Sequence, residues 1–123
     1  MRTRFFNKGE KMKNFRCYQL AKTQYLRVKT LKLPRYQADQ LQRASLSVFL
    51  NLAEGSGKSG VKDRRRFYEI ALASHREVQA LIDLIELTEL NEVADRLGGG
   101  LFNLVRQLTA EAVNLRIPLA GTK

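Results

Sequence analysis

The sequence predicts an all-α fold and, within that class, an antiparallel up-down-up-down four-helix bundle. Apolar residues recur at spacings of three and four in four successive segments, which is the period of an amphipathic helix. Short stretches rich in proline, glycine and polar residues separate the segments, so consecutive helices are expected to run antiparallel. The 123 residues suffice for one domain with one core. We assign residues 14–115 to the bundle, residues 1–13 to a basic extension expected to be flexible, and residues 116–123 to a loose C-terminal tail.

The first predicted helix covers residues 14–31. Asn14 is a candidate N-cap. Pro34 is expected to stop the helix, because the residue before a proline avoids the helical region. The apolar stripe of this helix comprises Phe15, Tyr18, Ala21, Tyr25, Val28 and Leu31.

The second predicted helix covers residues 37–54 and is apolar on two sides. One stripe comprises Leu41, Ala44, Val48 and Leu52, and a second face comprises Leu46, Leu50 and Ala53. A helix with two apolar sides is central in its bundle or contacts another subunit. Residues 46–52 also alternate as a strand would, but the length of the segment and its charged start favour a helix. Gly55 is expected to end it.

The third predicted helix covers residues 62–87, and its apolar stripe comprises Phe67, Ala71, Ser74, Val78, Leu81 and Ile85. The fourth begins near Asn91, a candidate N-cap, and extends towards Leu115. Three consecutive glycines, residues 98–100, interrupt it. They either break the helix or let its backbone approach a neighbouring helix closely. We expect a continuous but weakened helix, because the apolar period persists from Val93 to Leu108.

The formal net charge of +10 is concentrated at the N-terminal end. Residues 1–36 contain eleven Lys or Arg and one acid, Glu10, whereas residues 37–123 contain eleven of each sign. Such an asymmetry indicates a polyanionic partner, and nucleic acid is the favoured class. The alternative is that the charge serves solubility alone.

The rest of the composition excludes several classes of function. One cysteine, Cys17, allows no internal disulfide, which fits a cytoplasmic protein. One histidine, His75, cannot form a zinc site with that cysteine, so no metal or cofactor is expected. No Ser-His-Asp, Cys-His or paired-carboxylate motif is visible, so we expect no enzyme and interpret both residues as packing residues. No apolar stretch is long enough for a membrane. Met1 and Met12 are both possible natural starts.

The segment Gly55-Ser56-Gly57-Lys58-Ser59-Gly60 resembles the end of a phosphate-binding P-loop. The full pattern needs a glycine where this chain has Leu52, and it needs a preceding strand. We therefore expect a flexible helix-helix connection. Lys58 and Lys62, beside the amides that begin a helix, remain candidates for binding one backbone phosphate.

The basic residues define the candidate nucleic-acid site. Tyr18 and Tyr25 lie among them and could stack on bases, but their helical spacing favours the core. Arg65 can pair with Glu69 one turn later. Arg43, Glu54 and Glu77 are predicted to form a buried or intersubunit ion network. The predicted nucleic-acid-binding residues are Arg16, Lys22, Arg27, Lys29, Lys32, Arg35, Lys58, Lys62, Arg64 and Arg65.

Five stretches of this chain carry a resemblance to a known family. They are Tyr18-Gln19-x-Ala21, Leu33-Pro34, Asp39-Gln40-Leu41-x-Arg43-Ala44, Ser47-Val48-x-x-Asn51-Leu52-Ala53-Glu54-Gly55-Ser56-Gly57, and Arg66-Phe67-Tyr68-x-Ile70-Ala71-Leu72-Ala73-Ser74 with Glu77. Over about residues 14–115 the chain resembles the bacterial four-helix bundle proteins linked to intervening sequences in 23S rRNA genes. The family often has Pro-Ser where this chain has Phe49-Leu50, so the second helix is expected to be straighter. The shared residues look structural and identify no ligand site.

The resemblance implies an antiparallel four-helix bundle that assembles as a ring-like homopentamer, with a connection to RNA or DNA. A basic pentameric bundle of similar fold is the accessory protein of diversity-generating retroelements. The favoured hypothesis is a non-enzymatic, oligomeric nucleic-acid-binding protein, with RNA favoured over DNA. The alternative is a protein-interaction adaptor that docks an acidic partner, such as a reverse transcriptase or another polymerase.

Overall fold

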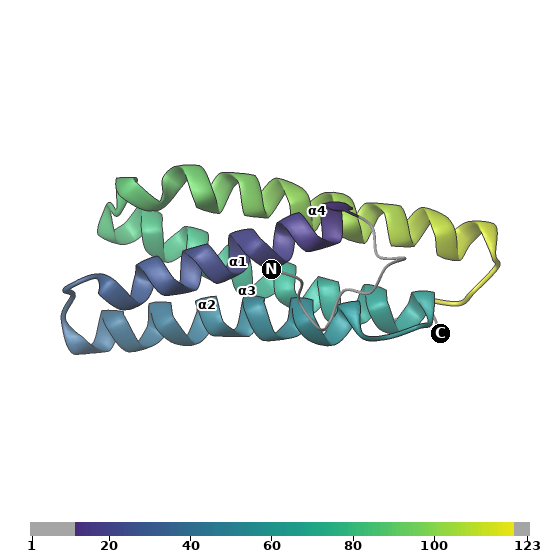
Figure 1. The fold of residues 1–123 in the computed structure, drawn as a ribbon, viewed down its shortest axis with the longest axis horizontal. Helices are drawn as coiled ribbons and strands as arrows, with labels where there is room; N and C mark the ends of the chain where they lie inside the picture. Colours follow the sequence, from purple (N-terminus) through teal and green to yellow (C-terminus); the bar gives the residue numbers. More distant parts are fainter. Residues whose placement is uncertain (1–11, 120–123) are drawn as a thin grey trace.

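The computed structural model describes residues 12–119 and shows four long helices packed side by side (Figure 1). They are α1 (Met12–Thr30), α2 (Arg35–Ser56), α3 (Val61–Ile85) and α4 (Asn91–Asn114), with a short 3-10 helix, η1 (Thr88–Leu90), before α4. Within the described range there is no strand. The predicted all-α four-helix bundle is confirmed. Residues 1–11 of the predicted extension, including the alternative start at Met1, and residues 120–123 of the predicted tail lie outside this range.

Successive helices run in opposite directions along the bundle (Figure 1). Cross-helix hydrogen bonds give the register of α2 on α3. The Ser56 hydroxyl lies 3.1 Å from the Tyr68 hydroxyl, and the Ser47 hydroxyl lies 2.7 Å from the Ser74 hydroxyl. The residue number falls along α2 as it rises along α3, which is the pattern of an antiparallel pair.

The core is the apolar stripe of each helix, turned inward. Its fully buried side chains come from all four helices and from η1, because each apolar stripe must be buried against the others. The largest apolar ones are Tyr68, Leu41, Leu52, Leu90, Leu97, Leu101, Val28, Val48 and Val78. Tyr18 is also buried and packs on Phe49 of α2 with ring centroids 4.8 Å apart, whereas Tyr25 is only partly buried.

The second helix differs from its prediction at both ends. It begins at Arg35, directly after Pro34, which occupies the N-cap position. At the other end Gly55 does not terminate the helix, which continues to Ser56. Gly55 is buried, and a Cβ there would lie 2.7 Å from the Tyr68 ring. The prediction that Gly55 ends α2 was wrong, because this glycine serves a close helix approach instead of a turn.

Neither predicted asparagine cap exists. Asn14 is the third residue of α1, is buried, and donates a hydrogen bond from Nδ2 to the Tyr68 hydroxyl at 3.2 Å. Asn91 is the first residue of α4, and no side chain caps that helix. Asn91 is not a cap because the preceding turn, η1 with its buried Leu90, leads directly into α4.

The triple glycine lies within one continuous helix, as predicted. A Cβ on Gly100 would lie 2.6 Å from the Cys17 Sγ, and one on Gly98 would lie 3.0 Å from the Gln79 Nε2. A Cβ on Gly99 would meet nothing within 4 Å. Two of the three glycines therefore permit close packing, against α1 and against α3, and the third faces open space.

Candidate nucleic-acid interface

The structure divides the predicted basic residues of α1 between two sides of that helix. Lys22 and Lys29 lie on the same flank as Tyr18 and Tyr25, towards α2, and the Lys29 Nζ lies 5.6 Å from the Tyr25 ring centroid. Arg16 and Arg27 lie on the other flank, and both line cavities against α4. These four side chains do not share one surface.

The remaining predicted cations lie at opposite ends of the bundle (Figure 1). Lys32 and Arg35 lie at the connection between α1 and α2, where Arg35 makes a long, exposed ion pair with Asp39 at 3.9 Å. Lys58 and Lys62 lie at the connection between α2 and α3. The two connections are separated by the length of α2, about 33 Å for 22 residues.

At the second connection, Lys58 pairs with Glu54 at 3.3 Å and lies over the Phe67 ring, 5.3 Å from its centroid. The Lys58 ammonium is thus engaged within the chain, whereas Lys62 is exposed. The connection follows a helix, where a P-loop would follow a strand.

Arg64 and Arg65 are directed into the bundle. Arg65 makes the predicted pair with Glu69 at 3.1 Å and donates from Nε to the Thr109 hydroxyl at 2.7 Å, with 15% of its side chain exposed. The Arg64 Nε is buried, and no hydrogen-bond partner for it lies within residues 12–119. Arg65 therefore fastens α3 to α4, which leaves its guanidinium little exposed for binding a phosphate.

The three members of the predicted ion network, Arg43, Glu54 and Glu77, are all exposed. They do not form a buried network within one chain, so that version of the prediction was wrong. Arg43 and Glu77 flank the hydrogen-bonded pair Ser47 and Ser74 at helical spacing, one on each side of the α2–α3 seam. A network between subunits stays a prediction.

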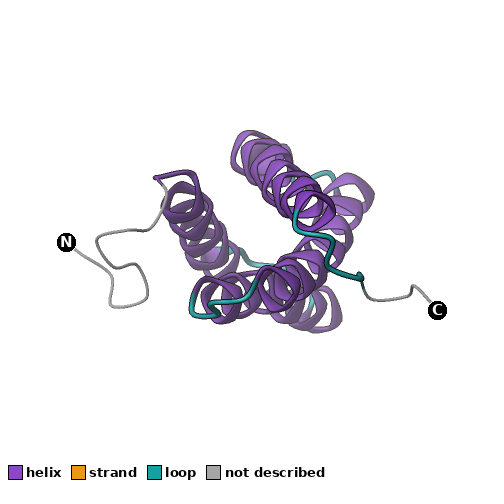
Figure 2. Ribbon diagram, turned by 90° about the vertical axis from the view of Figure 1, so that its right-hand side faces the viewer, coloured by secondary structure: helices purple, strands orange, loops and turns teal. Residues whose placement is uncertain are grey.

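A groove between α1 and α4 is the main concave feature that contains predicted residues. Viewed close to end-on, the ribbons of α1, at the left, and α4, at the top, stand well apart (Figure 2). A cavity of about 420 Å³ lies there, and a second of about 180 Å³ continues it, with Leu20 and Arg96 lining both. We call this the α1/α4 groove; its lining residues are Arg16, Cys17, Leu20, Thr23, Arg27, Glu92, Val93, Asp95, Arg96, Gly99, Gly100 and Asn103.

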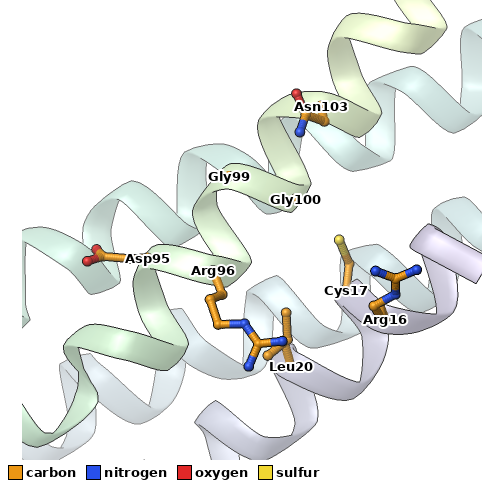
Figure 3. Close-up of a pocket in the computed structure, with 8 residues that line it drawn as sticks. All are labelled: Arg16, Cys17, Leu20, Asp95, Arg96, Gly99, Gly100 and Asn103. Carbon is orange, nitrogen blue, oxygen red and sulfur yellow. The ribbon is translucent and has the colours of Figure 1, made fainter.

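Arginine side chains dominate the rim of the α1/α4 groove. In Figure 3 the Arg96 guanidinium extends from α4 towards Leu20 on α1, and Arg16 lies farther along α1, beside Cys17. The Asp95 carboxylate points away from α1 (Figure 3). Arg16, Arg27 and Arg96 are exposed, and none of them makes an ion pair with another described residue. The lining of the groove thus holds three arginines and two acidic residues, Glu92 and Asp95.

Sequence reasoning missed Arg96, because the second part of the chain is balanced in charge and no excess marks this residue. Its position in the sequence relative to the glycines could have indicated that it belongs to the site. Arg96 lies three residues before Gly99, hence on the same flank of α4, and the missing side chain of Gly99 leaves room there.

His75 is a packing residue, as predicted. It is fully buried; its Nε2 lies 2.8 Å from the Ala94 carbonyl oxygen and its Nδ1 3.4 Å from the Gln24 Nε2. A carbonyl only accepts, so Nε2 carries the proton and Nδ1 accepts from Gln24. Burial lowers the His75 pKa below its ordinary value, and the nearby Arg76 charge acts in the same direction. The Ala94 hydrogen bond and the Asp95 charge oppose that shift.

Among the described residues, no group of three or more His, Cys, Asp or Glu side chains is arranged to hold a metal ion. Cys17 is buried against Gly100. None of the described helices combines the length and the apolar content needed to cross a bilayer.

Comparison with known proteins identifies a family. A family model described as 23S rRNA-intervening sequence protein matches residues 13–110, which is most of the bundle. This is a family of small helical proteins and not a known enzyme family. No curated protein and no solved structure matches the chain. The match over residues 13–110 and the four-helix architecture together show that the chain belongs to the 23S rRNA-intervening sequence protein family.

Proposed function

We propose that this chain is a non-enzymatic, oligomeric nucleic-acid-binding protein that acts in the cytoplasm and prefers RNA to DNA. The observation that carries the proposal is the α1/α4 groove, where Arg16, Arg27 and Arg96 are exposed without an acidic partner. Guanidinium groups bind phosphate oxygens well, because their planar donors match the geometry of the anion. On a chain of net charge +10, such contacts release condensed counterions and drive binding with little dependence on base sequence.

Two further observations support the proposal. The family description refers to an element of rRNA genes, which favours RNA as the nucleic acid. Lys22, Lys29 and Lys32 extend the positive charge over the exposed surface of α1 and its exit. Long-range attraction by these lysines would raise the rate of encounter with a polyanion.

Exposed apolar side chains on two flanks of α3 support the oligomeric part of the proposal. Leu50 and Ile70 flank the bonded pair Ser47 and Ser74, and both are exposed. On the other flank, Leu72 and Ala73 of α3 line a shallow cavity with Val105 of α4. Two different apolar faces suit a head-to-tail contact, which closes into a ring when the rotation allows it. A homopentamer is one such ring.

The test is binding of the full chain to fluorescently labelled structured RNA and to duplex DNA across a salt series, with the mass measured in parallel. We expect an oligomer that binds RNA, with log affinity falling linearly and steeply with log salt. Charge reversal of both Arg16 and Arg27 is expected to reduce the affinity and the slope. The absence of binding at low salt would contradict the proposal.

The second candidate is an adaptor that docks an acidic protein, such as a polymerase-type partner. The same exposed apolar faces favour it, because apolar side chains on a chain of net charge +10 suit contact with an acidic protein surface. An association that survives nuclease treatment, with a purified reverse transcriptase or another polymerase, would place the adaptor ahead of nucleic-acid binding.

A further inference from the structure

We infer that the α1/α4 groove takes the sugar-phosphate backbone of a single nucleic-acid strand and not a duplex. This rests on the proposed function and adds the class of ligand. Three features of the groove carry it: the line of its arginines, its dimensions, and its floor.

The arginines follow the direction of the groove. Arg16 and Arg27 are eleven residues apart on α1, which is about 16 Å along the helix axis. Arg96 reaches towards α1 from the opposite wall and lines both cavities, so it lies between them (Figure 3). The three guanidinium groups therefore form a row along the groove. A row of cations about 16 Å long suits the phosphates of a short stretch of one strand.

The dimensions of the groove exclude a duplex from its floor. The two cavities measure about 420 and 180 Å³ and lie between two adjacent helices. A volume of this order holds a ligand of nucleotide size. A duplex is stiff over about 150 base pairs, so it cannot bend into a furrow that is a few nucleotides long. It would contact only the rim, whereas a flexible single strand can enter.

The floor offers both apolar and backbone contact. Leu20 provides an apolar surface from α1, and Gly99 leaves the backbone of α4 without side-chain cover on this flank. The space above Gly99 is open, since a Cβ there would meet nothing within 4 Å. Asn103 adds an amide that can donate to a phosphate or a base (Figure 3). A ribose or a base edge can pack where a side chain would otherwise stand.

The first experiment tests the charges with a matched pair of variants. The ligands are a labelled 12-nucleotide oligouridine strand and a 12-base-pair RNA duplex. We expect the unaltered chain to prefer the single strand. Arg96→Glu is expected to weaken strand binding at least about tenfold, because an attraction becomes a repulsion, and to lower the salt slope by about one or more. Arg66→Glu carries the same charge change at an exposed position of α3 that does not line the groove, and is expected to change the affinity less than about threefold.

The second experiment fills the groove without changing its charge. Gly99→Leu places a side chain in open space, so the helix content and unfolding temperature should be retained. Single-strand binding is expected to fall at least about tenfold, because the side chain occupies the floor. Ala80→Leu, an exposed position of α3 that does not line the groove, is the control and should bind normally.

The outcomes separate this inference from the proposed function. If the chain binds the duplex at least as tightly as the strand, and Arg96→Glu and Gly99→Leu bind as the unaltered chain does, the groove is not a single-strand site although nucleic-acid binding stands. If the unaltered chain binds neither ligand at low salt, the proposed function itself fails.

Discussion

His75 is the clearest case in this bundle of a core residue whose burial changes its protonation. Its imidazole is fully buried and hydrogen-bonded at both nitrogens in the neutral form. Protonation would place a charge in the core and remove the acceptor that Gln24 uses, and the pKa of His75 is accordingly lowered.

The pH dependence of stability follows from that shift. The folded chain resists protonation of His75, whereas the unfolded chain takes up the proton near the ordinary imidazole pKa of 6.5. The stabilisation is therefore complete above that pH and is lost as the pH falls below it, towards the lower pKa of the folded state. Urea unfolding at pH 7.5 and 5.5 should show a decrease in midpoint for the unaltered chain and a smaller decrease for His75→Gln. Equal decreases would show that His75 is not the titrating group.

Two adjacent glycines should respond to alanine with opposite signs. Gly99→Ala is expected to stabilise the chain by about 1 kcal/mol, because the helix gains a residue of higher propensity and the Cβ meets open space. Gly100→Ala is expected to destabilise it by up to about 2 kcal/mol, because the new Cβ overlaps the buried Cys17 Sγ. Thermal unfolding measures both.

The double variant Cys17→Ala with Gly100→Ala tests the contact itself. Removal of Sγ makes room for the added methyl group, so the pair should cost less than the sum of the single changes. Additive costs would show that the limit at Gly100 is not this contact.

At the scale of the helix, particular polar contacts decide how neighbouring elements are joined. Arg65 connects α3 to α4 through Thr109, whose hydroxyl in turn donates to the Val105 carbonyl at 2.8 Å. On the α2 side of α3, the hydroxyls of Ser47 and Ser74 meet at 2.7 Å. Each contact bridges two helices whose apolar stripes alone would permit some rotation.

Arg65→Met is expected to destabilise the chain by about 1–2 kcal/mol, because a charge-assisted hydrogen bond and its ion pair are lost in a part of the surface with little solvent. Lys62→Met, at an exposed position on the same turn of α3, should change the stability little. The measurement is the free energy of unfolding from urea titration. A similar effect of the two changes would argue against a structural role for Arg65.

At the scale of the whole molecule, the exposed apolar residues bear on assembly. Leu50 is 53% exposed beside the α2–α3 seam, and Leu26 is 50% exposed on α1, away from that seam. If the seam is a contact between subunits, Leu50→Lys should lower the mass measured by light scattering, because it would place an ammonium group in an apolar contact. Leu26→Lys should leave the mass unchanged. A monomeric unaltered chain would contradict the oligomeric part of the proposed function.

Assembly and binding should be linked. An oligomer presents several α1/α4 grooves to one polyanion, and simultaneous engagement raises the effective affinity without new contacts. A variant that no longer assembles with other subunits should therefore bind a long RNA much more weakly than the unaltered chain does. Its affinity for a short oligonucleotide should change little.

Much of the architecture could be predicted from residue order, because the period of apolar residues along a helix is a local property. The four helices and the continuity of α4 through Gly98–Gly100 follow from it, whereas α1 ends at Thr30 and Pro34 is the N-cap residue of α2. The caps at Asn14 and Asn91 and the end at Gly55 were predicted wrongly. Each depended on a partner far along the chain, such as Tyr68, or on a turn, such as η1.

The candidate site, like the fold, could be predicted from the sequence only in part. By itself the sequence determined that the chain is a helical bundle with a basic N-terminal third, since composition and periodicity need no spatial information. Only the tertiary structure decided which cations share a surface. Helical spacing alone separates Arg16 and Arg27 from Lys22 and Lys29 on α1, whereas the packing of α1 against α4 is what places Arg96 beside Arg16 and Arg27. The net charge of a segment is the sum of its residues and can be read from the sequence. A binding surface needs side chains that face the same space. Which side chains do so depends on how each helix is rotated about its axis.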